Sequence, residues 1–68
     1  MSDLYWSNVC IMSLKHSHDK TFEYAVYQIE DVDRKSKILD IREKWLNGDE
    51  HVRQVVNSFS VELPVVIA

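Results

Sequence analysis

The chain has 68 residues, of which 46% are hydrophobic and 28% are charged, with a formal net charge of −3 at pH 7. This length supports one domain, residues 1–68, and the composition excludes a disordered segment. Cys10 is the single cysteine, so an intrachain disulfide is excluded and a reducing, cytoplasmic location is expected. No apolar run reaches the ~18–20 residues of a membrane span and no signal peptide is recognisable, so we interpret the chain as a complete small protein.

Two segments in the first half of the chain predict the strands of a β-hairpin. Residues 4–14 are rich in aromatic and β-branched side chains, and the centre of this segment, residues 9–12, is apolar at every position. Residues 21–29 place aromatic and β-branched side chains at the alternating spacing of a strand. Because residues 15–20 are polar and few, we expect them to connect the two strands as a hairpin loop.

The next segment predicts a helix. Residues 30–33 bring three carboxylates to its expected start, where they would meet the positive end of the helix dipole. Four acid–base pairs lie four residues apart with the acid first, which is the favourable order in a helix. These pairs are Glu30–Arg34, Asp31–Lys35, Asp33–Lys37 and Asp40–Lys44. Apolar side chains at helical spacing form one stripe, which consists of Ile38, Leu39, Ile41, Trp45 and Leu46.

A break in the helical pattern follows at Gly48. This residue suits the left-handed position that ends a helix, and Asp49 suits the N-cap of a second helix. A second apolar stripe then consists of Val52, Val55, Val56 and Phe59. We expect two helical segments separated by Gly48, with one kinked helix as the alternative.

The last segment, residues 60–68, predicts a third strand, in which Pro64 favours an edge position. The expected order is ββααβ, or ββαβ if the helices merge. A right-handed crossover would place the first strand in the middle of a three-stranded sheet of order 2-1-3, with the helices on one face. The sequence therefore predicts a single small α+β domain.

Residues that could carry chemistry have simpler structural interpretations. His16, His18 and Asp19 could bind a metal ion, but zinc requires four ligands, or three and a water. The spacing of Cys10 and His51 brings neither close to this cluster, so we interpret the cluster as a polar loop. Cys10 lies among apolar residues, which favours a buried side chain rather than a nucleophile. We predict a non-enzyme with no metal, no cofactor and no small-molecule substrate.

The basic residues of the predicted first helix suggest nucleic-acid binding as an alternative function. They are Arg34, Lys35, Lys37, Arg42 and Lys44, and acidic residues are interleaved with them. A helix–turn–helix over residues 38–56 would use residues 49–57 for recognition, but this segment has one arginine and no lysine. We therefore favour a solvated, ion-paired helix face and keep nucleic-acid binding as the alternative.

Aromatic residues of the predicted hairpin indicate a protein-binding surface. A three-stranded sheet with helices on one side leaves its other face exposed, and tyrosine and tryptophan are enriched at interfaces. Carboxylates at the start of the helix would steer a basic partner. The predicted protein-binding residues are Tyr5, Trp6, Tyr24, Tyr27, Glu30, Asp31 and Asp33. The apolar edge at residues 65–68 offers a competing route, through homodimerisation or strand addition to a partner.

No segment matches a motif of a known family. In size and expected topology, a hairpin followed by helix and strand, the chain resembles several small bacteriophage and mobile-element proteins that inhibit or redirect host proteins. This resemblance implies an accessory protein that inhibits or regulates a larger host protein. A homodimeric structural protein is a further alternative.

Overall fold

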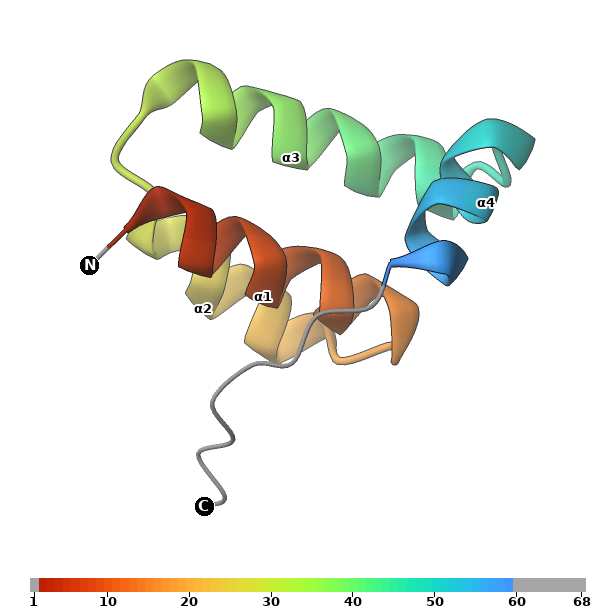
Figure 1. Ribbon diagram of the computed structural model, residues 1–68, viewed down its shortest axis with the longest axis horizontal. Coiled ribbons are helices and arrows are strands. Elements are labelled where there is room, and N and C mark those ends of the chain that lie inside the picture. The colour runs from red at the N-terminus through yellow and green to blue at the C-terminus, as the bar shows by residue number, and fades with distance from the viewer. Residues whose placement is uncertain (1, 60–68) are drawn as a thin grey trace.

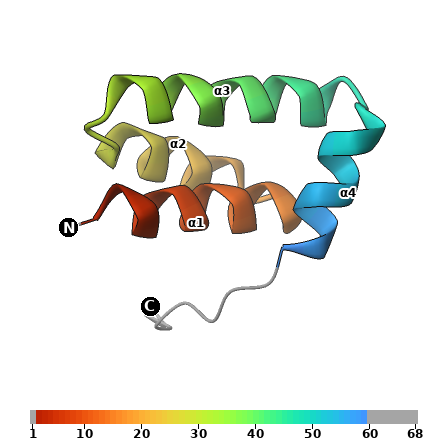
Figure 2. The same cartoon turned by 45° about the horizontal axis from the view of Figure 1, so that its top comes forward.

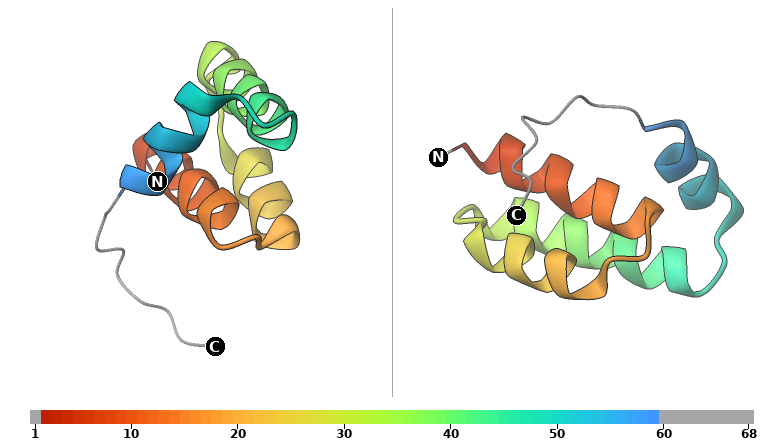
Figure 3. Two further views of the ribbon diagram at one scale, coloured as in Figure 1. Left: turned by 90° about the vertical axis from the view of Figure 1, so that its right-hand side faces the viewer. Right: turned by 90° about the horizontal axis from the view of Figure 1, so that it is seen from below.

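The computed structural model describes residues 2–59, which form four α-helices (Figure 1). They are α1 (Asp3–Lys15), α2 (Asp19–Gln28), α3 (Val32–Leu46) and α4 (Glu50–Ser58). The first three helices lie side by side, with α2 running opposite to α1 and α3 (Figure 2). The shorter α4 lies across the ends of α1 and α3 and contacts both (Figure 3).

The predicted α+β fold is wrong for this part of the chain. Residues 2–59 contain no strand, so neither the β-hairpin of residues 4–14 and 21–29 nor the three-stranded sheet of order 2-1-3 exists as expected. The two segments are instead α1 and α2, which pack as an antiparallel helical pair. The predicted third strand, residues 60–68, lies outside the described residues.

The buried face of α1 explains why its sequence predicted a strand instead of a helix. Four of the five buried positions of α1, Ser7, Cys10, Ile11 and Leu14, recur at helical spacing, and the fifth is Ser13. A hydrophobicity pattern does not register the two serines. The Ser7 hydroxyl donates a hydrogen bond to the Asp3 carbonyl at 2.7 Å, one helical turn back. This local bond satisfies the hydroxyl, so a polar residue fits the buried face of a helix.

The segment that forms α2 was likewise predicted to be a strand. Residues 22, 24 and 26 were expected on one face of a strand, yet Phe22 is buried and Tyr24 is 62% exposed. Phe22, Ala25 and Ile29 are the buried residues, and their spacing is that of one helical face. Short segments dense in apolar residues fit both periods, and here the helical period is correct.

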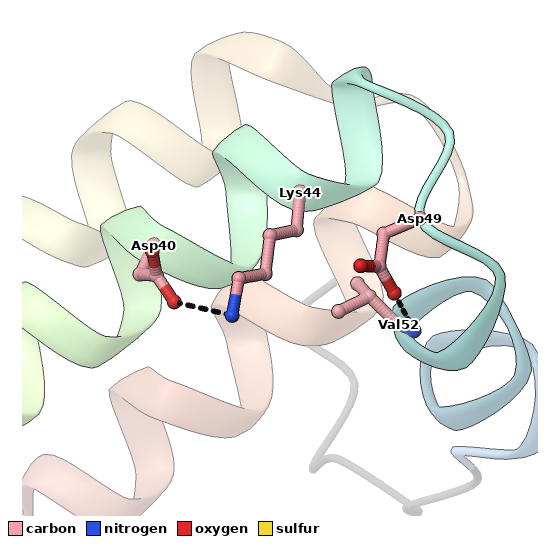
Figure 4. Close-up of polar contacts among 4 residues, drawn as sticks. All are labelled: Asp40, Lys44, Asp49 and Val52. Atoms are coloured by element: carbon pink, nitrogen blue, oxygen red, sulfur yellow. Dashed lines mark hydrogen bonds and ion pairs between the residues drawn. The ribbon is translucent and has the colours of Figure 1, made fainter.

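The prediction of two helical segments separated at Gly48 is confirmed, but Leu39, Leu46 and Val55 of the two predicted apolar stripes are exposed. Gly48 has a φ of +81° and separates α3 from α4, so the chain forms two helices rather than one kinked helix. Asp49 caps α4 by accepting a hydrogen bond from the Val52 amide at 3.0 Å (Figure 4). Of the four predicted acid–base pairs, Asp40–Lys44 forms an ion pair, at 3.2 Å.

All four helices contribute to one hydrophobic core. Within residues 2–59 it has nine members, which are Cys10, Ile11, Leu14, Phe22, Ala25, Ile29, Ile38, Val52 and Val56. Lys15 also ties the end of α1 to the end of α4, because its ammonium donates a hydrogen bond to the Phe59 carbonyl at 2.9 Å. The core therefore holds the α1–α2 pair against α3 and α4 and fixes where each exposed side chain lies.

Candidate protein-binding surface

Three of the predicted binding residues meet where α1 and α2 pack side by side. Tyr5 and Trp6 lie at the start of α1, with ring centroids 4.9 Å apart and planes at 82°. Trp6 also contacts Tyr24 of α2 edge to face, with centroids 5.8 Å apart and an angle of 73°. Edge-to-face contacts of this kind are favourable for aromatic rings, so the three side chains hold one another in place.

Tyr27 extends this group along α2. It lies one helical turn after Tyr24, and its side chain is 80% exposed, the most exposed large apolar residue among those described. The Lys35 ammonium of α3 lies 6.0 Å from the centre of its ring, at the outer limit of a cation–π contact. Tyr5, Trp6, Tyr24 and Tyr27 together are called the aromatic patch below.

The predicted acidic residues lie at the same end of the molecule. Glu30, Asp31 and Asp33, called the acidic corner below, form the connection from α2 to the first turn of α3. The Asp3 carboxylate at the start of α1 accepts hydrogen bonds from the Glu30 and Asp31 amides at 3.1 and 2.9 Å. This link brings the start of α1, which carries Tyr5 and Trp6, next to the segment of the acidic corner (Figure 1).

The two amide hydrogen bonds also affect the titration of Asp3. They hold the pKa of its carboxyl below the ordinary value, with the Arg34 guanidinium acting in the same direction. A lowered pKa in the folded state means that the ionised carboxylate stabilises the fold. This contribution is complete above the ordinary aspartate pKa and is lost as the pH falls through the lowered value. The link between α1 and the acidic corner therefore weakens in acid.

The acidic residues have different roles. The Asp31 carboxylate accepts a hydrogen bond from the Arg34 amide at 3.0 Å and caps α3. Glu30 and Asp33 are exposed. Beside them, a surface depression of about 350 Å³ runs along α3 and is lined by Asp31, Asp33, Arg34, Lys37, Ile38 and Ile41. The acidic corner therefore combines a carboxylate that caps α3 with two further exposed carboxylates, of which Asp33 lines the depression.

Sequence reasoning missed Asp3, Leu4 and Val32 as members of this end of the molecule. Leu4 and Val32 are exposed apolar residues at the starts of α1 and α3. If residues 3–15 form a helix, Leu4 lies outside the buried stripe that contains Ser7 and Leu14. This position on the helix is the signal that could have identified Leu4 as an exposed apolar residue. Asp3 carries no comparable signal, because its partners are backbone amides of a distant segment.

The alternative chemistries find less support in the described residues. Cys10 is buried, and burial raises the pKa of its thiol to about 12, which suppresses the nucleophilic thiolate at neutral pH. Within residues 2–59, no three His, Cys, Asp or Glu side chains lie close enough together to hold a metal ion, and His16, His18 and Asp19 are no exception.

The basic side chains are largely engaged within the fold. Arg42 lies over the Phe22 ring, 5.2 Å from its centre, and Arg34 donates a hydrogen bond to the Ser7 hydroxyl at 3.4 Å. Lys44 pairs with Asp40, and Lys35 lies over Tyr27. Four of the five basic residues of α3 thus contact other side chains of the fold, which leaves fewer of them free to pair with a phosphate backbone.

No family model, no curated protein and no solved structure matches the chain. Within residues 2–59, every helix is too short or too polar to cross a bilayer.

Proposed function

We propose that this chain is a non-enzymatic, cytoplasmic protein-binding module that recognises a larger protein through the aromatic patch and the acidic corner. The observation that carries the proposal is the exposure of Tyr24 and Tyr27 on one helix, with Tyr24 in contact with Trp6, which in turn contacts Tyr5. A binding module of this kind could inhibit or regulate the larger protein to which it binds.

Physical reasoning favours binding over a purely structural role for these two tyrosines. A tyrosine side chain brings a large contact area with few rotatable bonds, so burying it against a partner costs little conformational entropy. Tyr24 is also held by its edge contact with Trp6, which restricts the ring before a partner arrives. Exposed, pre-oriented aromatic residues are typical of the residues that dominate binding energy at interfaces.

The acidic corner supports the same surface. Glu30 and Asp33 are exposed, and Asp3 ties their segment to the start of α1, so a partner that buries the aromatic patch would place its own side chains near these carboxylates. Charges at the rim of an interface raise the rate of association with a partner of opposite charge. We therefore expect a partner with a basic surface.

The resemblance to bacteriophage and mobile-element proteins lends no further support. It depended on a hairpin followed by helix and strand, and residues 2–59 have no hairpin of strands. The proposal depends on the aromatic patch and the acidic corner alone.

The test compares capture of partners by the full chain and by surface variants. The full chain and the Tyr24→Ala, Tyr27→Ala and Val55→Ala variants are immobilised, and proteins retained from a lysate of the native cells are identified by mass spectrometry. Val55 is a matched control because it is also exposed and apolar, but lies on α4. We expect a partner that the wild type and Val55→Ala capture equally.

Affinity for the captured partner then decides the proposal. Each tyrosine variant should bind it at least about tenfold more weakly, with an unchanged thermal midpoint, because the lost contact lies at the interface. Equal capture by all four proteins, or equal loss in Val55→Ala, would contradict the proposed surface. Unfolding of the tyrosine variants would show that these residues stabilise the fold instead.

Self-association is a second candidate, favoured by a different surface. Val32, Leu39 and Leu46 are all exposed on α3 and lie seven residues apart, which places them along one side of the helix. A second copy of the chain could bury this row. Sedimentation equilibrium should then show a dimer that Leu39→Glu dissociates and Tyr27→Ala leaves intact; a monomer at all concentrations would exclude this candidate.

A further inference from the structure

The turn between α1 and α2 brings two imidazoles and a thioether to one surface cavity. The cavity has a volume of about 250 Å³ and is lined by Val9, Met12, Ser13, His16, His18 and Thr21. Met12 and His16 lie one helical turn apart, with the His16 amide donating a hydrogen bond to the Met12 carbonyl at 3.1 Å. Their side chains therefore lie on the same side of the end of α1. His18 reaches the cavity from the start of α2.

The spacing of the imidazole rings suits a shared ion. Metal–nitrogen bonds of about 2.0–2.1 Å place the centres of two coordinated rings about 5 to 6.5 Å apart, from a tetrahedral to a linear arrangement. The ring centroids of His16 and His18 are 6.4 Å apart. Both residues are exposed, so a small rotation of either side chain can bring the two rings closer together without disturbing the core. The shorter separation would allow a bent nitrogen–copper–nitrogen angle.

His18 has no capping role in the helix that it begins. It occupies the N-cap position of α2, but its side chain makes no capping hydrogen bond. The N-cap residues of the other three helices are Ser2, Asp31 and Asp49. Each of their side chains accepts a hydrogen bond from a backbone amide. A histidine where a capping residue would stabilise the helix needs another explanation, and the neighbouring imidazole and thioether supply one.

We propose that Met12, His16 and His18 bind one Cu(I) ion at this turn. The thioether is a soft ligand that favours Cu(I), and imidazole binds copper well. The cavity lining contains no carboxylate, which disfavours magnesium, calcium and manganese. Asp19 does not line the cavity, so these three ligands differ from the set of His16, His18 and Asp19 that the sequence offered for zinc. The site is independent of the aromatic patch.

The experiment measures Cu(I) affinity of the full-length, tag-free chain under anaerobic conditions, in competition with a chromophoric Cu(I) chelator. We expect one equivalent of Cu(I) to bind the wild type. Met12→Leu, His16→Ala and His18→Ala should each bind at least about tenfold more weakly, since even an outer-shell change commonly costs that much. His51→Ala is the matched control, because His51 is exposed on α4 and does not line the cavity.

A second measurement separates this site from the cysteine, which is also a soft ligand. Cys10 is fully buried in the folded chain, so it should stay unreactive toward a thiol reagent while Cu(I) binds. Under the same conditions, the methyl resonance of Met12 should shift on adding Cu(I), and circular dichroism should show unchanged helix content. Unchanged affinity in a His16→Ala/His18→Ala double variant would overturn the proposal. A shift confined to the Met1 methyl, or copper-dependent exposure of Cys10, would also overturn it.

Discussion

Two turns of this molecule have the same backbone hydrogen bonds but very different sequences. At the end of α1, the Ser17 and His18 amides donate to the Leu14 and Ser13 carbonyls, at 3.2 and 2.8 Å. At the end of α3, the Gly48 and Asp49 amides donate to the Trp45 and Lys44 carbonyls, at 3.2 and 2.9 Å. Both patterns are the Schellman motif, which ends a helix with a residue of positive φ.

The residues of the second turn suit this geometry, and those of the first do not. Gly48 adopts its φ of +81° without a Cβ penalty, whereas Ser17 adopts +59° against the preference of an L-residue. Asp49 caps the helix that follows, whereas His18 makes no side-chain cap. We infer that local sequence stabilises the α3–α4 turn, and that packing imposes the α1–α2 turn.

The core supports this difference between the two helical pairs. Six of its nine members belong to α1 and α2 with the C-cap residue Ile29, and three belong to α3 and α4. Burial of apolar surface is the dominant favourable term in folding, so the first pair can tolerate a strained turn. Local sequence and packing therefore stabilise different parts of one small domain.

The largest expected effect is that of Phe22→Ala, which tests packing in the first pair. Phe22 is buried, so removing its ring should lower the free energy of unfolding by about 3–5 kcal/mol. Urea denaturation followed by circular dichroism measures this change. Tyr27→Ala on the same helix is the control and should leave the midpoint nearly unchanged. A loss below about 1 kcal/mol would show that packing does not hold the first pair together.

Gly48→Ala should have the next largest effect. A Cβ at this position would lie 3.9 Å from the nearest atom of Arg53, so there is room for it, and the cost is conformational. We expect a loss of about 1–2 kcal/mol, because an L-residue is disfavoured at positive φ. The same denaturation experiment measures it, and no loss at all would mean that the second turn does not depend on its glycine.

Asp49→Ala and His18→Ala form a matched pair of N-cap variants. Asp49→Ala removes a capping hydrogen bond and should lower the free energy of unfolding by about 1 kcal/mol. His18→Ala removes no such bond and should leave stability almost unchanged in metal-free buffer. Thermal melts of both variants give the comparison. Equal losses would contradict the difference between the two turns.

Ser17→Gly should have the smallest effect and the opposite sign. It relieves the positive φ of Ser17 but increases the freedom of the unfolded chain, which leaves a net gain of about 0.5 kcal/mol. A melt at matched pH and salt detects this gain, with Ser36→Gly within α3 as a control that should lose stability. Destabilisation by Ser17→Gly would show that the serine side chain has a role of its own.

Both proposed sites involve the helical pair that departs from locally favourable sequence. The aromatic patch lies on α1 and α2, and Met12, His16 and His18 lie at the turn that joins them. Natural sequences depart from the locally best residue most often at functional positions. In α3 and α4, by contrast, Asp31, Gly48 and Asp49 are accounted for by capping and turn geometry.

The sequence predicted that hairpin aromatic residues share one surface, but it did not predict the helices that bring three of them together. Tyr5, Trp6 and Tyr24 were expected on an exposed sheet face, and they form a cluster across two packed helices. Their chemistry, large and partly polar rings beyond the needs of a small core, does not depend on whether the backbone is a strand or a helix. The link between the start of α1 and the acidic corner was not predictable, because it requires the Asp3 carboxylate to accept hydrogen bonds from amides 27 and 28 residues away.

The sequence alone determined where the two helices of the second half begin and end. The acidic N-caps and Gly48 of α3 and α4 indicate these boundaries, because helix termini are specified by local hydrogen bonding and backbone geometry. Which residues of the apolar stripes are buried was decided by packing, since Leu39, Leu46 and Val55 are exposed. Tertiary structure decided the first half. Residues 4–14 suit a strand by composition, and they form a helix because Cys10, Ile11 and Leu14 meet the other helices on one face. Burial against distant partners outweighed local preference there.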